Sequence, residues 1–208
     1  MITVNEMRTL LAAVIAVCGL AAHAAEAPKP VVEVKRPPIQ PTPKSITVNA
    51  GDMALTLQSR IIATDPRLEA HAAVLRDEIL CITNWRLNIV AAKDAAGAEK
   101  AGDIILKINP KIQADEDILA PENVQLVRTR NMAHTVSVTD KVVVEGWDVR
   151  ATCEGTACVI QSIAGANGKF SIPHMTIKDW PHADFTAIMV DCGRQWIPAD
   201  ALKASVEA

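Results

Sequence analysis

The sequence predicts an α+β fold in which a mixed β-sheet carries two helices packed on one face. Ile104, Leu106 and Ile108 recur at every second position of residues 103–109, which is typical of a strand with one face on a core. Residues 66–83 and 148–163 repeat apolar side chains at helical spacing. Two β-prone runs flank Asp140 and Lys141, as the strands of a hairpin do. Together these patterns indicate two layers, a sheet and a pair of helices.

The folded part is expected to begin near Lys44 with short strands. Residues 45–48 are β-prone, and the turn-forming residues 49–52 close this run. Residues 54–57 and 60–63 are two further strand candidates.

A helix is predicted to follow these strands. Asp65 can cap its free N–H groups, and Pro66 suits the first helical position. The helix should run to about Thr83. Its predicted apolar face consists of Leu68, Leu75, Ile79 and Ile82.

The next elements are a strand over 87–91, a loop over 93–102 and an irregular acidic stretch over 111–122. The hairpin strands are 135–138 and 142–145. The predicted apolar face of the second helix consists of Val149, Cys153, Ala157 and Ile160.

The N-terminal residues 1–24 have the pattern of a secretory signal peptide. Arg8 gives a positive start, residues 10–22 are uninterruptedly apolar, and small residues at Ala22 and Ala24 predict a cut before Ala25. A membrane anchor is the alternative, but this run is shorter than the roughly 20 residues that span a bilayer. We therefore expect an exported protein, periplasmic or extracellular, that leaves the membrane after cleavage.

Residues 25–43 are predicted to form a linker. The stretch 28–43 is dense in proline, which favours an extended chain over a packed one. The net charge of the chain is −3, which gives no electrostatic reason to expect binding to nucleic acid.

No metal site or cofactor is expected from the cysteines and histidines. The cysteines that remain after cleavage are interpreted as small buried apolar residues, with disulfides as the alternative that export permits. They are Cys81, Cys153, Cys158 and Cys192. The histidines are interpreted as surface or loop residues without metal-ligand spacing; they are His71, His134, His174 and His182.

A stretch near the C-terminus carries several residues at fixed offsets. It contains Ile172-Pro173, Thr176-Ile177, Asp179-Trp180-Pro181, Phe185, the apolar run 188–190, Asp191 and Arg194. This pattern resembles the junction between the N-terminal domain and the catalytic barrel of glycoside hydrolase family 20, the β-N-acetylhexosaminidases. The second predicted helix adds Asp148, Gly155 and Gln161 at matching offsets.

The chain departs from the family pattern at several positions. Ala151 stands where glycine is usual, and residues 186–187 stand where Arg-Gly is usual. Gln195 stands where His is usual. The sequence also ends ten residues after Pro198. The resemblance therefore implies an N-terminal-like domain over 44–170, followed by 171–208 as the junction and truncated start of a (β/α)8 barrel.

The resemblance implies hydrolysis of terminal non-reducing N-acetylhexosamine from a glycan. In this family an Asp-Glu pair acts with the substrate's own acetamido group, and that pair lies well beyond the matched strand. The dipeptides Asp77-Glu78 and Asp115-Glu116 fall in a helix and an acidic loop and are not equivalent to it. No catalytic residue is therefore expected, and the chain should be inactive alone. The alternative is a stand-alone, non-catalytic domain that binds glycan or protein.

One residue carries over a role from the family. Arg194 matches the arginine that holds hydroxyl groups of the terminal sugar, and a guanidinium suits paired hydrogen bonds. Asp191 would support it. The alternative is a surface arginine that pairs with Asp191 or Asp200.

Overall fold

The structure is a computed structural model that describes residues 36–115, 132–181, 198–201 and 203. Several predictions rest on residues that lie outside the described ones: the apolar run 188–190, Asp191, Cys192 and Arg194. The fold below is that of the domain formed by 36–181.

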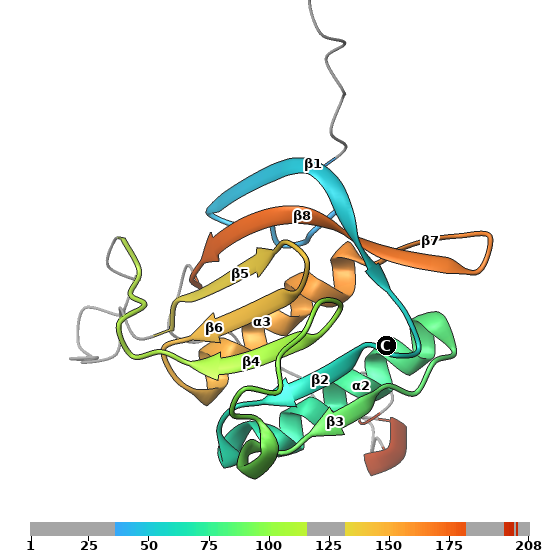
Figure 1. Cartoon of the computed structure of the whole chain (residues 1–208). Coiled ribbons are helices and arrows are strands. Elements are labelled where there is room, and N and C mark those ends of the chain that lie inside the picture. Colours follow the sequence, from blue (N-terminus) through green and yellow to red (C-terminus); the bar gives the residue numbers. More distant parts are fainter. Residues whose placement is uncertain (1–35, 116–131, 182–197, 202, 204–208) are drawn as a thin grey trace, which may run out of the picture. The chain divides into compact units, whose positions relative to one another are not determined.

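Eight strands form one mixed sheet (Figure 1). Its order is β1-β8-β5-β6-β4-β2-β3, with β7 paired to β8. The half from β3 to β6 is parallel, and the half from β6 to β1 is antiparallel. The strands are β1 Ser45–Leu55, β2 Arg60–Ala63, β3 Asn88–Val90, β4 Ile104–Ile108, β5 His134–Val138, β6 Val142–Gly146, β7 Ala164–Ala166 and β8 Lys169–Asp179.

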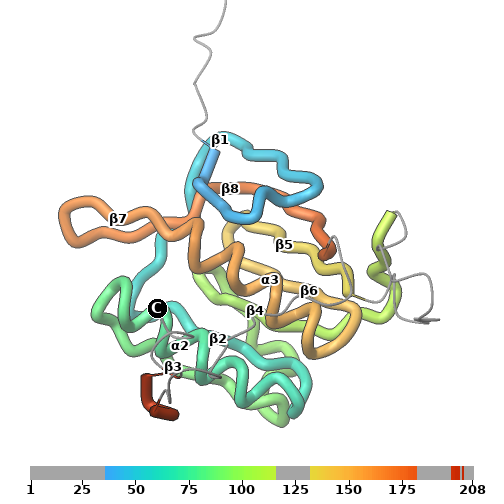
Figure 2. The backbone as a smooth tube through the Cα atoms, turned by 180° about the vertical axis from the view of Figure 1, so that it is seen from behind, coloured from blue at the N-terminus to red at the C-terminus, as the bar shows by residue number. Residues whose placement is uncertain are grey.

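Two α-helices cover one face of the sheet, as the sequence predicts (Figures 1 and 2). They are α2, Glu69–Thr83, which follows the 3-10 turn Pro66–Leu68, and α3, Val149–Ser162. Nε2 of His71 on α2 lies 2.8 Å from Oγ1 of Thr156 on α3. The main core fills the space between these helices and the sheet.

The strand predicted from the alternation of residues 103–109 is confirmed as β4. Ile104 and Leu106 face the main core. Ile105 faces the other side, where it packs with Ile62 and Ala95 in a smaller cluster. The expected loop over 93–102 contributes Ala95 to this smaller cluster. It also includes the end of the 3-10 turn Ala92–Asp94.

The turn predicted at 49–52 is wrong. β1 runs through this stretch and pairs with β8 on both sides of it, with a register shift between Val48 and Asp52. Gly51 has φ +97, and a Cβ there would lie 3.0 Å from the His174 ring. The turn-forming residues therefore build an irregularity within one strand.

The apolar faces predicted for the helices need correction. Leu75 and Ile79 on α2 are buried, as is Leu68 in the 3-10 turn before it, but Ile82 is 41% exposed. On α3 the buried side is made of smaller residues: Ala151, Thr152, Gly155, Thr156, Cys158, Val159 and Ser162. Small side chains let α3 lie close to the sheet, which hydrophobicity alone does not reveal.

The expected domain boundaries also differ from the structure. Ile39 is 5% exposed and belongs to the main core, and Pro43 is buried. The prediction that 25–43 packs poorly is therefore wrong for residues 36–43. The boundary expected between 170 and 171 falls inside strand β8.

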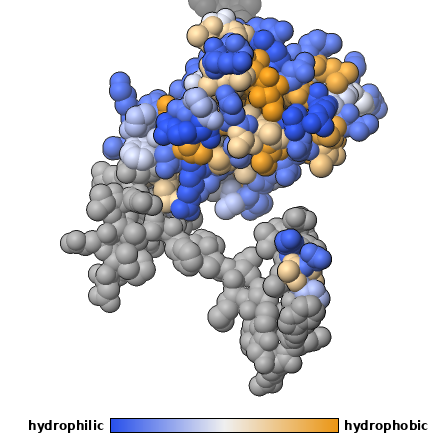
Figure 3. Space-filling model, turned by 90° about the horizontal axis from the view of Figure 1, so that it is seen from below, coloured by the Kyte–Doolittle hydropathy of each residue, from blue (hydrophilic) through white to orange (hydrophobic). Residues whose placement is uncertain are grey.

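The surface of the domain mixes hydrophilic and hydrophobic residues (Figure 3). The large hydrophobic side chains that it exposes are Leu57, Val74 and Ile82. Within the described ranges, no helix is both long and apolar enough to cross a membrane.

The three described cysteines are free thiols. Cys158 is buried, as the sequence interpretation has it, and Cys153 is partly buried. Cys81 is exposed on α2, so the interpretation as a buried apolar residue is wrong there.

Candidate functional site

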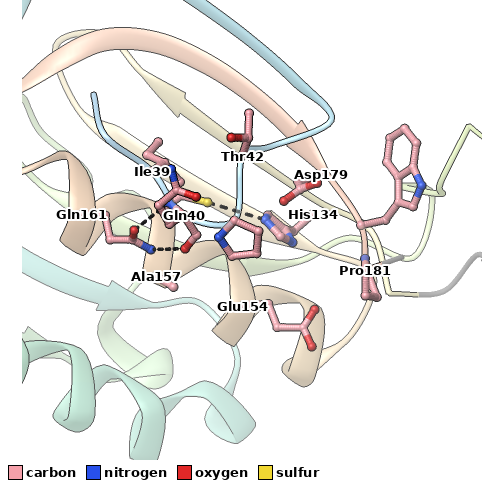
Figure 4. A pocket seen from close by; sticks show the side chains of 12 residues that line it. Ile39, Gln40, Thr42, His134, Glu154, Ala157, Gln161, Asp179 and Pro181 are labelled. Atoms are coloured by element: carbon pink, nitrogen blue, oxygen red, sulfur yellow. Dashed lines mark hydrogen bonds between the residues drawn. The ribbon is translucent and has the colours of Figure 1, made fainter. Parts of the chain in front are cut away.

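A cavity of about 400 Å³ opens between α3, the segment 36–43 and the adjoining ends of β5 and β8 (Figure 4). We call the segment 36–43 the N-terminal strap. Both apolar and polar residues line the cavity. The lining residues are Ile39, Gln40, Pro41, Thr42, His134, Glu154, Ala157, Cys158, Gln161, Asp179, Trp180 and Pro181.

His134 is the most deeply placed polar group of the cavity. It is the first residue of β5, opposite Asp179 of β8 in the strand register, and it is 4% exposed. Its Nε2 lies 4.0 Å from Sγ of Cys158, whereas its buried Nδ1 has no hydrogen-bond partner among the described residues. Burial lowers the pKa of His134, while the Asp179 carboxylate acts to raise it.

Helix α3 contributes three polar groups from one face. Glu154, Cys158 and Gln161 follow each other at spacings of four and three residues. Burial raises the pKa of Glu154, and Arg150, whose Nε lies 3.1 Å from Oε1, opposes this. Burial, with the charge of Asp179, raises the pKa of the Cys158 thiol to about 11. Cys158 is therefore a protonated thiol and a poor nucleophile.

The N-terminal strap forms the outer wall. The backbone N–H of Gln40 donates to Oε1 of Gln161 at 2.8 Å, and Nε2 of Gln161 donates to the Gln40 carbonyl at 3.0 Å. The backbone N–H of Lys44 donates to Oδ1 of Asp179 at 3.1 Å. These bonds tie the middle of the strap to α3, and the residue that follows the strap to β8.

Trp180 lines the cavity beside Pro181. It is 7% exposed and packs with Ala114, Met132 and Ala133. The ammonium groups of Lys44 and Lys178 lie 5.7 and 5.9 Å from its ring centroid. The indole thus belongs to a small hydrophobic cluster of its own, and its π face attracts the two ammonium groups.

Three of the carboxylates that the sequence excludes from catalysis are described and lie apart from the cavity, whereas Glu116 lies outside the described residues. Asp77 and Glu78 are exposed on α2, where Arg76 pairs with Asp77 at 2.8 Å and holds its pKa below the usual value. Asp115 is exposed and pairs with Lys178. The predicted helical position of Asp77-Glu78 is confirmed.

The sequence interpretation of the histidines is wrong in the cavity and on α2. His134 is buried, and His71 is a partly buried helical residue. His134 shares the strand parity of Val136 and Val138, both buried. That alternation is the signal that could have placed its side chain in the core.

The residues that match the family pattern hold the domain together. Asp148 caps α3, since its Oδ1 accepts from the backbone N–H of Ala151 at 2.9 Å. Gln161 and Asp179 fasten the N-terminal strap. Ile172 and Ile177 are fully buried in the main core. Among the described residues, no group of His, Cys, Asp and Glu could hold a metal ion.

Comparisons with known proteins point to one family. The sequence model described as glycosyl hydrolase family 20, domain 2, matches residues 36–180. A β-hexosaminidase of Vibrio furnissii is 23% identical over 163 residues, which cover 78% of this chain and 23% of that protein. The chain thus spans about a quarter of the length of this curated relative.

Solved structures share the fold. The exo-β-N-acetylglucosaminidase of Vibrio harveyi in complex with N-acetylglucosamine has a TM-score of 0.62 and 19% identity, over 81% of this chain and 23% of that one. The β-N-acetylhexosaminidase of Bacteroides fragilis has a TM-score of 0.60 and 18% identity, over 81% and 30%. The chitobiase of Flavobacterium johnsoniae has a TM-score of 0.59 and 20% identity, over 81% and 24%.

Proposed function

The chain belongs to the family described as glycosyl hydrolase family 20, domain 2, and on that premise we propose that it is the non-catalytic N-terminal part of an exported β-N-acetylhexosaminidase. The complete enzyme would remove terminal non-reducing N-acetylhexosamine from a glycan. Domain 2 would provide a rigid support for the catalytic domain.

The observation that carries this proposal is the structural use of the family pattern. Asp148, Gln161 and Asp179 each cap or fasten an element. In each of these contacts the side chain accepts a hydrogen bond from a backbone N–H of the same domain. A pattern that specifies packing is what a supporting domain requires, because chemistry is supplied by sites and not by a fold.

Hydrolysis by the purified full chain tests the inactive part of the proposal. We expect no release of nitrophenol from p-nitrophenyl N-acetylglucosaminide above a control without protein. Turnover that Glu78→Gln or Glu116→Gln abolishes would contradict the exclusion of those carboxylates. The reading frame beyond codon 208 tests the remainder: a continuation that encodes an Asp-Glu pair after a strand supports the enzyme, and unrelated sequence supports a stand-alone binding domain.

We also propose that Arg194 contacts the terminal sugar in the complete enzyme and that Asp191 supports it. The support is the match of both positions to the family pattern. In an active enzyme that contains this chain, Arg194→Lys should raise KM more than it lowers kcat, because a single ammonium cannot form the paired bonds of a guanidinium. An unchanged KM would contradict this role.

Export is the remaining part of the proposal. Its support is the charged start, apolar run and small residues of 1–24. N-terminal sequencing of the protein from its producing cell should begin at Ala25. A product that begins at Met1 and stays in the membrane fraction would favour the anchor.

A further inference from the structure

We propose that the cavity beneath the N-terminal strap binds an organic cation, a guanidinium or primary ammonium group on an apolar body. The first reason is a buried ring nitrogen without a hydrogen-bond partner. His134 lines this cavity and is 4% exposed, and its buried Nδ1 has no hydrogen-bond partner among the described residues. A buried polar atom without a partner costs about 1–3 kcal/mol, and a donor brought by a ligand would remove that cost.

The charges of the cavity select a cation. Asp179 and Glu154 both line it, and none of the described residues that line it is Lys or Arg. Arg150 pairs with Glu154 from outside, and Lys44 and Lys178 lie over Trp180 without lining the cavity. An anion would meet two carboxylates, whereas a guanidinium or ammonium group can donate to both and to Nδ1 of His134.

The walls select an apolar body behind the charged group. The apolar residues that line the cavity are Ile39, Pro41, Ala157, Trp180 and Pro181. Ile39, Ala157 and Pro181 are labelled in Figure 4. A volume of about 400 Å³ lies within the range of small-molecule sites. A strongly hydrated metal ion would leave these walls unused, and no metal-binding group of three occurs in the described chain.

The cavity is formed before a ligand arrives. Gln161 holds the Gln40 backbone by two hydrogen bonds, and Ile39 anchors the strap in the main core. A wall that is already fixed needs little ordering on binding, so more of the contact energy appears as affinity.

Isothermal titration calorimetry of the full chain with n-butylguanidinium tests the proposal. n-Butylurea is the matched neutral probe, since it has the same shape without the charge. We expect saturable binding of n-butylguanidinium at least about tenfold tighter than that of n-butylurea, because hydrogen bonds to charged groups contribute about 1.5–3 kcal/mol. Equal affinity for the two probes, or no saturable binding of n-butylguanidinium, would overturn the proposal.

Matched variants locate the site. Glu154→Gln should weaken n-butylguanidinium binding about tenfold, whereas Glu78→Gln, an exposed carboxylate outside the cavity, should leave it unchanged. An unchanged affinity in Glu154→Gln would overturn the assignment. Because a variant can also fail to fold, the wild-type chain provides a second readout: the Nδ1 resonance of His134 should shift on titration, and a resonance that stays fixed at saturation would place the probe elsewhere.

Discussion

Gly155 determines how closely α3 approaches the sheet. A Cβ at this position would lie 2.7 Å from Cγ1 of Val144 and 3.1 Å from Cδ2 of His134. Both neighbours are buried, and Val144 is in the main core. The smallest residue therefore permits the contact between α3, β6 and β5 on which the cavity wall depends.

Gly155→Ala should lower the free energy of unfolding by about 1–3 kcal/mol, as overpacked cores do. This loss should exceed the gain in helix propensity, which is about 1 kcal/mol. Denaturant titration measures it. In a Val144→Ala background the methyl group at 155 has more room, so the same change should cost less. An equal loss in both backgrounds would show that contact with Val144 is not the cause.

The burial of His134 should make stability depend on pH. Its folded-state pKa lies below the ordinary value of about 6.5, so the unfolded chain takes up a proton that the folded chain excludes. Stability should therefore fall as the pH drops below about 6.5 and continue to fall until the folded-state pKa is passed. The pKa of His71 shifts in the same direction, and that of Glu154 in the opposite direction.

A comparison with His134→Gln isolates this contribution. The unfolding free energies of the two proteins, measured between pH 8 and pH 5, should run parallel above about pH 7 and diverge below about 6.5, with the wild type losing more. Curves that remain parallel down to pH 5 would show that His134 has an ordinary pKa in the folded protein.

At the scale of elements, the N-terminal strap is part of the domain. It adds Ile39 to the core, and the side-chain amide of Gln161 on α3 forms two hydrogen bonds with the Gln40 backbone. The proline content of 28–43 conceals this, because an extended proline-rich chain can be a free linker or a packed strap. The contacts with α3 and β8 show that this segment is a packed strap, and these contacts are not visible in the local sequence.

Ile39→Ala should therefore destabilise the domain by about 2 kcal/mol, since it removes a buried aliphatic side chain. The matched control is Leu57→Ala, because Leu57 is 55% exposed and should change stability by less than about 0.5 kcal/mol. Thermal or denaturant unfolding gives both values. Equal effects of the two substitutions would mean that the strap is not packed in solution.

At the scale of the whole molecule, the fold was more predictable than the candidate site. Period-two alternation in 103–109 and the turn at Asp140 and Lys141 locate β4 and the β5–β6 hairpin from local sequence. The buried face of α3 was missed because contact there depends on small residues such as Gly155. The cavity joins residues more than 90 positions apart, from Gln40 to His134, and no local pattern encodes such proximity.

The central claim is that residues 36–181 form a self-contained supporting domain. Thermal unfolding of residues 36–181 beside residues 25–208 tests it most directly. We expect one cooperative transition in each protein, with midpoints that agree within about 3 °C, the shift that corresponds to roughly 1 kcal/mol in a chain of this size. A midpoint lower by more than about 10 °C in the shorter protein would contradict the claim and show that segments outside 36–181 belong to the same folding unit.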